Sequence, residues 1–326
     1  MIPMPAEPTI GVVIVTHRAQ SHLRRCLPPL FASPLAPRVL VVNSSSGDGT
    51  VELAEELGAE VMIVPRRDFN HGATRECARR VLATDIVVML TPDAYPTHAG
   101  FVAELTRPIR DGRAAVAYGR QIPHTGADLF ERFDRAFNYP SESQLRSLAD
   151  WPAYGSYTHF CSNACAAWSN AALDAIGGFR PTLVSEETVA VAELLARGER
   201  IAYVAGAVVR HSHRNSLAGG FRRAFDIGWT RRLHGELLLA RGGEEARGRR
   251  YLSRLLAQVL QEAPWRLPEA LLHTALRYAG YRIGLVGPHL PHAWPPRLSG
   301  QDFFWDSELG RELATGGTGV PRAMVG

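Results

Sequence analysis

The sequence predicts an α/β fold, with a mostly parallel sheet flanked by helices and a helical C-terminal extension. Within residues 10–118, short apolar runs rich in β-branched residues alternate with longer amphipathic segments. The apolar runs are typical of strands buried on both faces, and the amphipathic segments are typical of helices. Strands separated by helices form βαβ units, which place their strands parallel. The helical spacing of leucines after residue 221 predicts the extension.

The elements of the first part follow one another closely. The expected strands are Ile10–Thr16, Val39–Asn43, Val61–Pro65 and Ile86–Thr91. The expected helices are His22–Phe31, Asp48–Leu57 and Ala73–Leu82, the second capped by Asp48 or Thr50.

The periodicity is lost between Gly119 and Thr158, a Pro- and aromatic-rich stretch typical of a lid or an acceptor loop. Order is expected to return in Phe160–Trp168, the helices Asn170–Ile176 and Ser185–Arg197, and the strand Ile201–Val204. Residues 221–286 then predict two or three amphipathic helices. We therefore divide the chain into a domain of residues 1–218 and an extension of residues 219–326, loose from Ala314 onward.

Composition limits the partners. The net charge of +4 and the pI of about 9.0 suit an anionic ligand or membrane surface and do not indicate nucleic acid. The chain has no lysine, so basic contacts to phosphate must come from Arg. The extension's helices are expected to pack on the domain or on a second subunit, with membrane-surface binding as the less favoured alternative.

Cysteine usage and hydropathy bear on the compartment. The four cysteines form no zinc or disulfide pattern, which favours a reducing compartment. The sequence has neither a signal peptide at its start nor an apolar run of membrane-spanning length. We expect a cytoplasmic protein, either soluble or peripheral at the inner face of the membrane.

Polar residues end three of the expected strands, in Thr16-His17-Arg18, Asn43-Ser44-Ser45-Ser46 and Thr91-Pro92-Asp93-Ala94. The carboxyl ends of parallel strands share one edge of the sheet, where ligands of such folds bind. We expect a nucleotide at this edge.

Asp93 and the pair His211 and His213 are candidate metal ligands. A carboxylate at a strand end can hold a divalent cation against a diphosphate, although Asp is also a common turn residue. The two histidines follow an extended run at a spacing that points both rings to the same side. Without a carboxylate near them, a hydrogen-bonded structural pair is the favoured interpretation.

Two weaker patterns remain. Glu186 and Glu187 begin a helix, where acidic residues commonly complement the helix dipole, but a carboxylate there could also serve as a general base. Asn70, Gly72 and Arg75 surround the start of another helix and form a workable anion site. The absence of GxGxxG and of a P-loop lysine argues against dehydrogenases and P-loop ATPases.

In this order, these segments resemble family 2 glycosyltransferases of the GT-A fold, a Rossmann-like fold, and more narrowly their rhamnosyltransferase-like members. The resemblance runs from about Ile10 to about Phe225. The motifs that carry it are VVIVTHR, VVNSSSGDGT, FNHGATRECARR, VVMLTPDAYP, YGRQIP, FNYP, FCSNACAAW, GGF, SEET and VVRHSH. It implies Mg²⁺- or Mn²⁺-dependent, inverting transfer of a sugar to a hydroxyl of a glycan or lipid-linked acceptor. The implied donor is dTDP-rhamnose or a UDP- or GDP-sugar.

The resemblance also implies roles for single residues. Glu187 corresponds to the catalytic base, Asp93 with His211 and His213 to the metal site, and Ser162, Asn163 and Glu186 to the acceptor side. The implied donor-binding residues are Thr16, Arg18, Asn43, Ser45, Asn70, Gly72, Arg75, Pro92 and Asp93.

Two alternatives stay open, and three departures from the family pattern bear on the second of them. Asn43 stands where Asp is usual, TPDA has a single carboxylate, and Glu186-Glu187 replaces Glu-Asp. One alternative is a sugar nucleotidyltransferase, but such enzymes need a Gly-rich loop after the first strand, and THRAQSH has no glycine. The other is a non-catalytic carbohydrate-binding or scaffold protein on a degenerate transferase fold.

Overall fold

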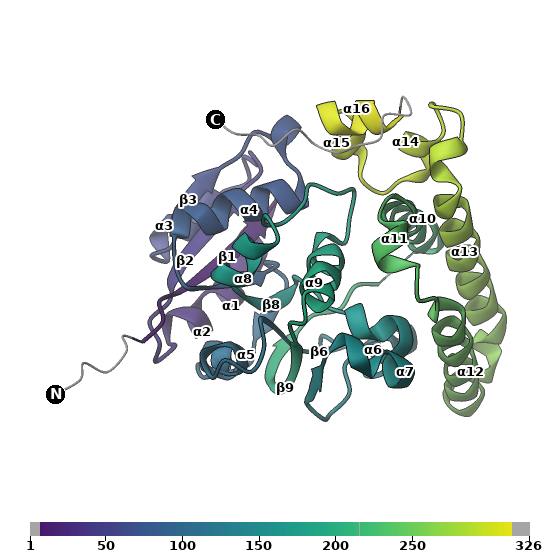
Figure 1. Ribbon diagram of the computed structural model, residues 1–326, viewed down its shortest axis with the longest axis horizontal. Coiled ribbons are helices and arrows are strands. Elements are labelled where there is room, and N and C mark those ends of the chain that lie inside the picture. Colours follow the sequence, from purple (N-terminus) through teal and green to yellow (C-terminus); the bar gives the residue numbers. More distant parts are fainter. Residues whose placement is uncertain (1–6, 215, 315–326) are drawn as a thin grey trace.

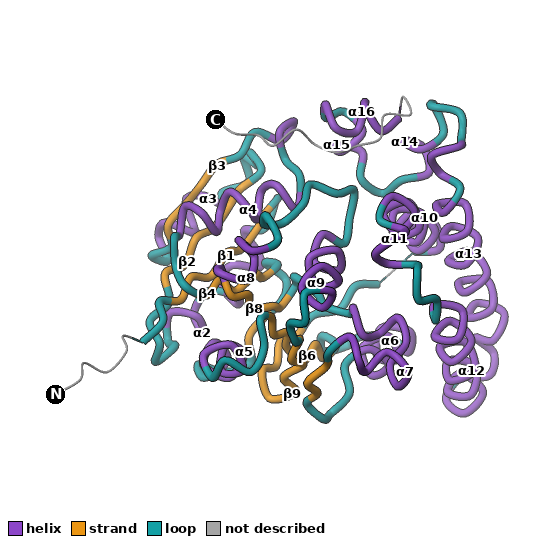
Figure 2. Tube along the Cα trace, viewed as in Figure 1, coloured by secondary structure: helices purple, strands orange, loops and turns teal. Residues whose placement is uncertain are grey.

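The computed structural model describes residues 7–214 and 216–314, arranged as a sheet with flanking helices and a helical C-terminal region (Figure 1). The sheet has nine strands in the order β3-β2-β1-β4-β8-β6-β9-β5, and β7 pairs with β9. The predicted fold class is confirmed. Figure 2 shows the strands gathered on one side of the molecule and the long helices of the extension on the other.

The first four long strands are parallel neighbours: β1 (Ile10–Thr16), β2 (Arg38–Asn43), β3 (Glu60–Ile63) and β4 (Ile86–Leu90). Alternate residues of these strands enter two separate buried clusters, one on each face of the sheet. Val12 and Ile14 lie in one cluster, whereas Val13 and Val15 lie in the other. Because both faces are covered, the strands are continuously apolar.

The helices of this half are α1 (Gln20–Cys26), α2 (Pro28–Phe31), α3 (Thr50–Glu56) and α4 (His71–Leu82). The single helix expected over 22–31 is wrong, because a second helix starts at Pro28, which has no N–H to donate to the preceding turn. The predicted cap of α3 is also wrong. Gly49 is the N-cap residue, and the Asp48 carboxylate instead accepts hydrogen bonds from the Ser46 and Thr50 hydroxyls.

Residues 119–158 are mostly ordered, so the irregular segment predicted there is wrong. They contain most of β6 (Val116–Ile122), then α6 (Leu129–Asn138), β7 (Gln144–Arg146), α7 (Trp151–Tyr154) and short 3₁₀ turns at Leu148–Asp150 and Gly155–His159. A capping box between Asp128 and Glu131 begins α6. The short strand β5 (Tyr95–Pro96) and the helix α5 (Phe101–Arg110) were not predicted from the sequence.

The remaining elements of the sheet region complete the site. They are β8 (Cys165–Ser169), α8 (Asn170–Ala175), α9 (Glu186–Ala196) and β9 (Ile201–Arg210). β8 lies antiparallel between β4 and β6, and β9 is one strand with an irregular register rather than two separate segments. Another 3₁₀ turn covers Arg66–Asp68.

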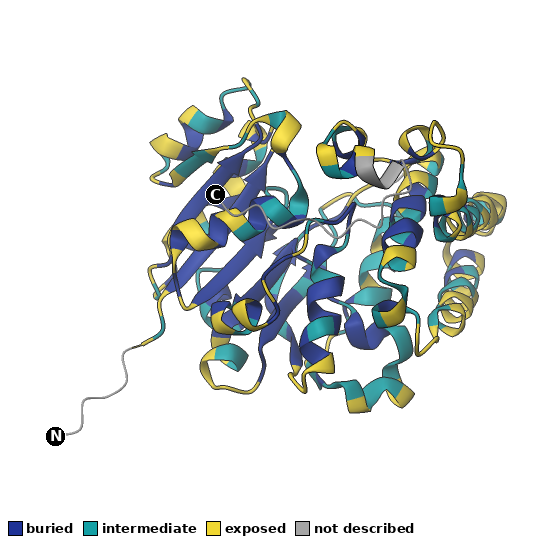
Figure 3. Ribbon diagram, turned by 45° about the horizontal axis from the view of Figure 1, so that its top comes forward, coloured by how far each residue is buried: buried dark blue, intermediate teal, exposed yellow. Residues whose placement is uncertain are grey.

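The C-terminal helices are α10 (Leu217–Leu233), α11 (Gly235–Leu238), α12 (Glu244–Glu262), α13 (Leu267–Leu285), α14 (Pro295–Leu298), α15 (Asp302–Trp305) and α16 (Glu308–Ala314), with 3₁₀ turns at Pro264–Arg266 and Gly287–His289. Helix α10 has both buried and exposed residues, whereas α12 and α13 bury few residues and expose much of their surface (Figure 3). No helix in the described part of the chain is long and apolar enough to cross a membrane. The tail predicted to be loose lies, after Ala314, outside the described residues.

Candidate active site

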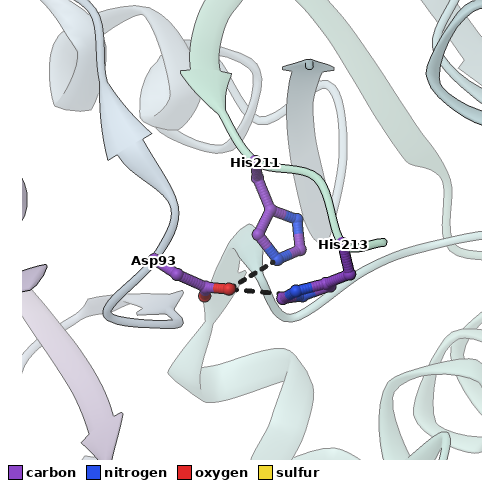
Figure 4. A group of neighbouring side chains, drawn as sticks. All are labelled: Asp93, His211 and His213. Carbon is purple, nitrogen blue, oxygen red and sulfur yellow. Dashed lines mark ion pairs between the residues drawn. The ribbon is translucent and has the colours of Figure 1, made fainter. Parts of the chain in front are cut away.

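Asp93, His211 and His213 lie together at the carboxyl ends of β4 and β9 (Figure 4). Asp93 follows Pro92 in the turn after β4, and both histidines follow β9. The Asp93 Oδ2 atom lies 3.4 Å from His211 Nε2 and 3.2 Å from His213 Nε2. One ligand atom from each residue lies within 4.8 Å of the others. Asp93 thus supplies the carboxylate whose absence would have favoured a purely structural role for the two histidines.

Gln121 on β6 fixes the orientation of the His211 ring. Its Oε1 atom lies 2.8 Å from His211 Nδ1 and accepts a hydrogen bond, also of 2.8 Å, from an Arg135 N–H on α6. Arg can only donate, so the Gln121 atom between these partners is the oxygen, and His211 Nδ1 must carry the proton. The lone pair of His211 therefore lies on Nε2, the atom that faces Asp93. A metal-binding histidine usually donates a hydrogen bond from its other ring nitrogen to such an acceptor.

The electrostatics of the three groups suit a cation. Burial disfavours ionisation of Asp93, but the hydrogen bond and charge that His211 supplies when both of its ring nitrogens are protonated outweigh it and lower the pKa of the carboxyl. Burial lowers the pKa of His211, and burial together with His211 lowers the pKa of His213 to about 4. Near neutral pH, an ionised carboxylate thus faces the lone pair of a neutral imidazole. A bound cation would convert that repulsion into attraction.

The base candidate Glu187 is half-buried in the first turn of α9. Burial and the neighbouring Glu186 carboxylate raise the pKa of Glu187 above its usual range. Among residues 7–214 and 216–314, the hydrogen bonding of its carboxylate is limited to the backbone of Glu187 itself. Such a carboxylate is suited to taking up a proton.

The adjacent Glu186 is buried and locked in place. It forms an ion pair with Arg75 of α4 and accepts a hydrogen bond of 3.0 Å from Asn163. Asn163 in turn accepts one of 2.9 Å from the Trp168 indole. Burial disfavours the charged form of Glu186, but Arg75 outweighs it and lowers the pKa of the carboxyl. Glu186 and Asn163, the residues expected on the acceptor side, and Arg75, expected at the donor, thus contact one another.

Ser162 and Asn163 link the two halves of the site. Gln121 donates to the Ser162 hydroxyl at 3.1 Å, and the same Gln121 holds His211. The next residue, Asn163, holds Glu186 beside Glu187. Hydrogen bonds at Ser162 and at its chain neighbour Asn163 therefore connect the candidate metal ligand His211 with the start of α9.

The expected nucleoside edge is formed by the ends of β1 and β2, where Thr16 and Asn43 are register partners. Both are buried, and the Asn43 amide donates to the Ser46 hydroxyl at 2.9 Å and accepts from its N–H at 2.8 Å. Arg18 and Ser45 both have positive φ angles, of 51° and 54°, and lie exposed on the two loops of this edge.

The start of α4 is already occupied by protein groups. Asn70 caps the helix by accepting from the N–H groups of Gly72 and Ala73, at 3.0 and 3.1 Å. Gly72 lies so close to the Arg180 carbonyl that a Cβ atom would overlap it. The donor-binding role expected of Asn70 and Gly72 stays a prediction.

Three residues that hold the site together were not predicted from the sequence: Gln121, Arg135 and Trp168. Gln121 lies within the YGRQIP motif, but no spacing in the sequence connects it to His211. The capping box before α6 was the available signal for the helix that carries Arg135.

A small pocket of about 50 Å³ lies beside His213, between α6 and the hairpin of α12 and α13. Its lining includes Glu131, Tyr251 and His273. A more open hollow of about 340 Å³ continues from it and shares His273. The extension thus contributes a wall next to the three candidate metal ligands.

Comparisons with known proteins agree on one kind of molecule. Residues 11–177 match the model of the family described as glycosyl transferase family 2. The chain is 32% identical over 302 residues to the O-antigen chain rhamnosyltransferase RfbN of Salmonella typhimurium, covering 91% of this chain and 96% of that one. It is 31% identical over 272 residues to the O-antigen chain rhamnosyltransferase WbaN of Salmonella anatum, covering 83% and 86%.

Two solved structures share the fold at low sequence identity. The mannosyltransferase PcManGT of Pyrobaculum calidifontis, in complex with GDP-Man and Mn²⁺, has a TM-score of 0.52 and 17% identity, with 90% of this chain and 85% of that one covered. TarS 1–349 of S. aureus in complex with UDP-GlcNAc has a TM-score of 0.50 and 13% identity, with 86% and 91% covered.

Proposed function

The chain belongs to glycosyl transferase family 2, and on that premise we propose that it is an inverting, metal-dependent rhamnosyltransferase. The family resemblance expected from the sequence is thereby confirmed, and the chain is a nucleotide-sugar-dependent glycosyltransferase. Two relatives named as O-antigen chain rhamnosyltransferases, similar over most of their length, support rhamnose as the sugar and an O-antigen glycan or its lipid-linked form as the acceptor. dTDP-rhamnose is the proposed donor.

Asp93, His211 and His213 would hold a Mg²⁺ or Mn²⁺ ion. Their fit to a cation is supported by the Nε2 lone pair of His211 and by the ionised Asp93 carboxylate opposite it. When bound, such an ion neutralises the charge that develops on a departing diphosphate.

Glu187 is the proposed base. Its carboxylate would take the proton of the acceptor hydroxyl as that oxygen attacks the anomeric carbon from the side opposite the nucleoside diphosphate. This attack inverts the configuration. Because its pKa is raised, Glu187 is a stronger base than an ordinary carboxylate.

The buried network behind Glu187 would keep it in position. Arg75 and Asn163 hold the neighbouring Glu186, so the first turn of α9 is fixed against α4 and the segment before β8. We propose that Arg75, Asn163 and Glu186 act mainly by orienting Glu187, whereas Thr16, Asn43, Arg18 and Ser45 surround the nucleoside. Residues 1–218 would then perform the chemistry, and the extension from residue 219 would form part of the acceptor's binding surface.

The proposal rests chiefly on the convergence of Asp93, His211 and His213 at one end of the sheet. Its test is transfer from dTDP-rhamnose to a purified O-antigen acceptor, with and without Mn²⁺, and determination of the new linkage by NMR. Metal-dependent transfer with inverted anomeric configuration supports the proposal. Retention, or transfer only from another sugar nucleotide, would contradict the mechanism or the donor respectively.

A further inference from the structure

The helix α13 has two faces of different character. Its inner face packs along α10, where Gly280 and Gly284 are buried against the α10 backbone. Its outer face and the turn before it expose large apolar side chains: Trp265, Leu271, Leu272, Tyr278 and Val286. Trp265 is 76% exposed and Tyr278 is 56% exposed. We call these five residues the outer face of α13.

The outer face of α13 forms one stripe on the helix. Leu271, Tyr278 and Val286 recur at spacings of seven and eight residues, and Leu272 adjoins Leu271 on the same side. The helix itself has 19 residues, a length of about 28 Å at 1.5 Å per residue, and Trp265 and Val286 lie just beyond its two ends. Figure 1 shows that α12 and α13 lie on the far side of α10 from the sheet. No element among the described residues covers this stripe.

The charges of this region are mostly positive, with Glu245, Glu262 and Glu269 as the exposed acidic residues of α12 and α13. No Asp or Glu occurs between Ala270 and Gln301, whereas the exposed Arg282 and Arg297 do. Arg277 instead faces Tyr251 and Asp134. The neighbouring helix α12 exposes Arg249, Arg250 and Arg254. An exposed apolar stripe with a Trp at its end and surrounding arginines matches the interface of an anionic bilayer, in which apolar groups enter the acyl boundary while arginines contact headgroups.

We propose that the outer face of α13 docks the protein on an anionic membrane surface. The helix lies in the plane of the interface, with Leu271 and Leu272 below the headgroups and Trp265 at headgroup level. A second copy of the chain fits this face less well than a membrane does. Isologous pairing of two copies through the face would bring their arginines close together. The inference does not depend on which sugar or acceptor the enzyme uses.

The test is co-sedimentation of the full-length protein with vesicles, without donor or acceptor. Binding is expected to vesicles of phosphatidylcholine mixed with phosphatidylglycerol and to be much weaker to phosphatidylcholine alone. The double variant Leu271→Gln/Leu272→Gln should reduce binding roughly tenfold or more. The triple variant Arg249→Gln/Arg250→Gln/Arg254→Gln should reduce binding roughly fivefold per arginine.

Val81→Gln is the matched control, because Val81 is an exposed apolar residue on α4, far from the extension. It should bind vesicles as the unaltered protein does. All of the substituted side chains are exposed, so folding should be preserved, which unchanged far-UV circular dichroism would verify.

Two results would overturn the proposal. One is failure of the unaltered protein to bind the anionic vesicles. The other is a dimer in lipid-free solution that the Leu271→Gln/Leu272→Gln variant converts to a monomer, since the face would then belong to a second copy.

Discussion

The protonation state of each candidate site residue depends on the residues that contact it. Gln121 determines which nitrogen of His211 carries the lone pair, and Glu186 with burial determines how readily Glu187 ionises. These relations give three predictions for single residues.

Glu187→Gln should lower kcat roughly 10²–10⁴-fold, because the amide cannot accept the acceptor's proton. Donor affinity should stay nearly unchanged, since the side chain keeps its size. Steady-state kinetics and donor titration measure the two effects. Glu199→Gln, an exposed change just beyond α9, is the control and should have no effect. Equal turnover in both variants would remove Glu187 from the role of base.

The pH dependence of turnover follows from the same carboxyl. Because the pKa of Glu187 is raised, the protonated and inactive form persists to higher pH than for an ordinary Glu. The rate constant kcat should therefore increase with pH through the raised pKa and level off above it. A pH–rate profile of the unaltered enzyme tests this. If kcat is already maximal at a pH near the usual pKa of Glu, ionisation of a carboxyl with a raised pKa does not limit turnover.

Gln121→Leu should weaken Mn²⁺ binding about 10–100-fold, because His211 loses the acceptor that fixes its proton on Nδ1. Gln121→Glu should largely retain binding, since a carboxylate can accept from both His211 and Arg135. Mn²⁺ titration followed by EPR reads affinity directly and does not depend on turnover. Gln258→Leu serves as the control. Gln258 lies on α12, and its side-chain amide donates a hydrogen bond to Glu262 of the same helix. Equal affinity in the Leu and Glu variants would assign Gln121 a purely structural role.

At the scale of elements, close packing of α10 and α13 holds the extension together. A Cβ atom at Gly284 would overlap the Phe225 carbonyl. Gly284→Ala should therefore destabilise the protein by about 1–3 kcal/mol through overpacking. Gly248→Ala on α12 is the matched control, because a Cβ atom there meets open space. It should stabilise by about 0.5–1 kcal/mol, since Ala favours a helix.

Urea unfolding curves of both glycine variants test this packing. The account of the interface would be wrong if the two substitutions changed the unfolding free energy in the same direction and by the same amount.

The elements also show what could be predicted from the sequence. The βαβ units before residue 91 could be predicted because buried strands and amphipathic helices have local periodicities. The antiparallel insertion of β8 between β4 and β6 could not, because strand pairing across distant segments leaves no local pattern. Helix α6 could have been found from its capping box, but the aromatic residues around it obscured the helical repeat.

In the candidate site, too, some features could be predicted from the sequence and others could not. Asp93, His211 and Glu187 could be selected from their positions at expected strand and helix ends and from the family resemblance. The contacts of Gln121 with His211, and of Arg75 with Glu186, depend on tertiary structure, so neither pairing could be read from residue types alone.

Across the whole molecule, segments that are distant in sequence come together at one end of the sheet. The turn after β4, the end of β9 and the start of α9 meet there through Gln121, Ser162 and Asn163. The C-terminal helices form a wall beside His213 and present a separate apolar face outward. Chemistry and surface docking thus occupy different sides of the extension.

Anomalous diffraction from crystals grown with Mn²⁺ and dTDP would locate the metal ion itself. We predict a manganese peak bounded by Asp93 Oδ2, His211 Nε2 and His213 Nε2, with the diphosphate of dTDP against it. A peak elsewhere in the molecule, or none at these three residues while dTDP is bound, would contradict the account.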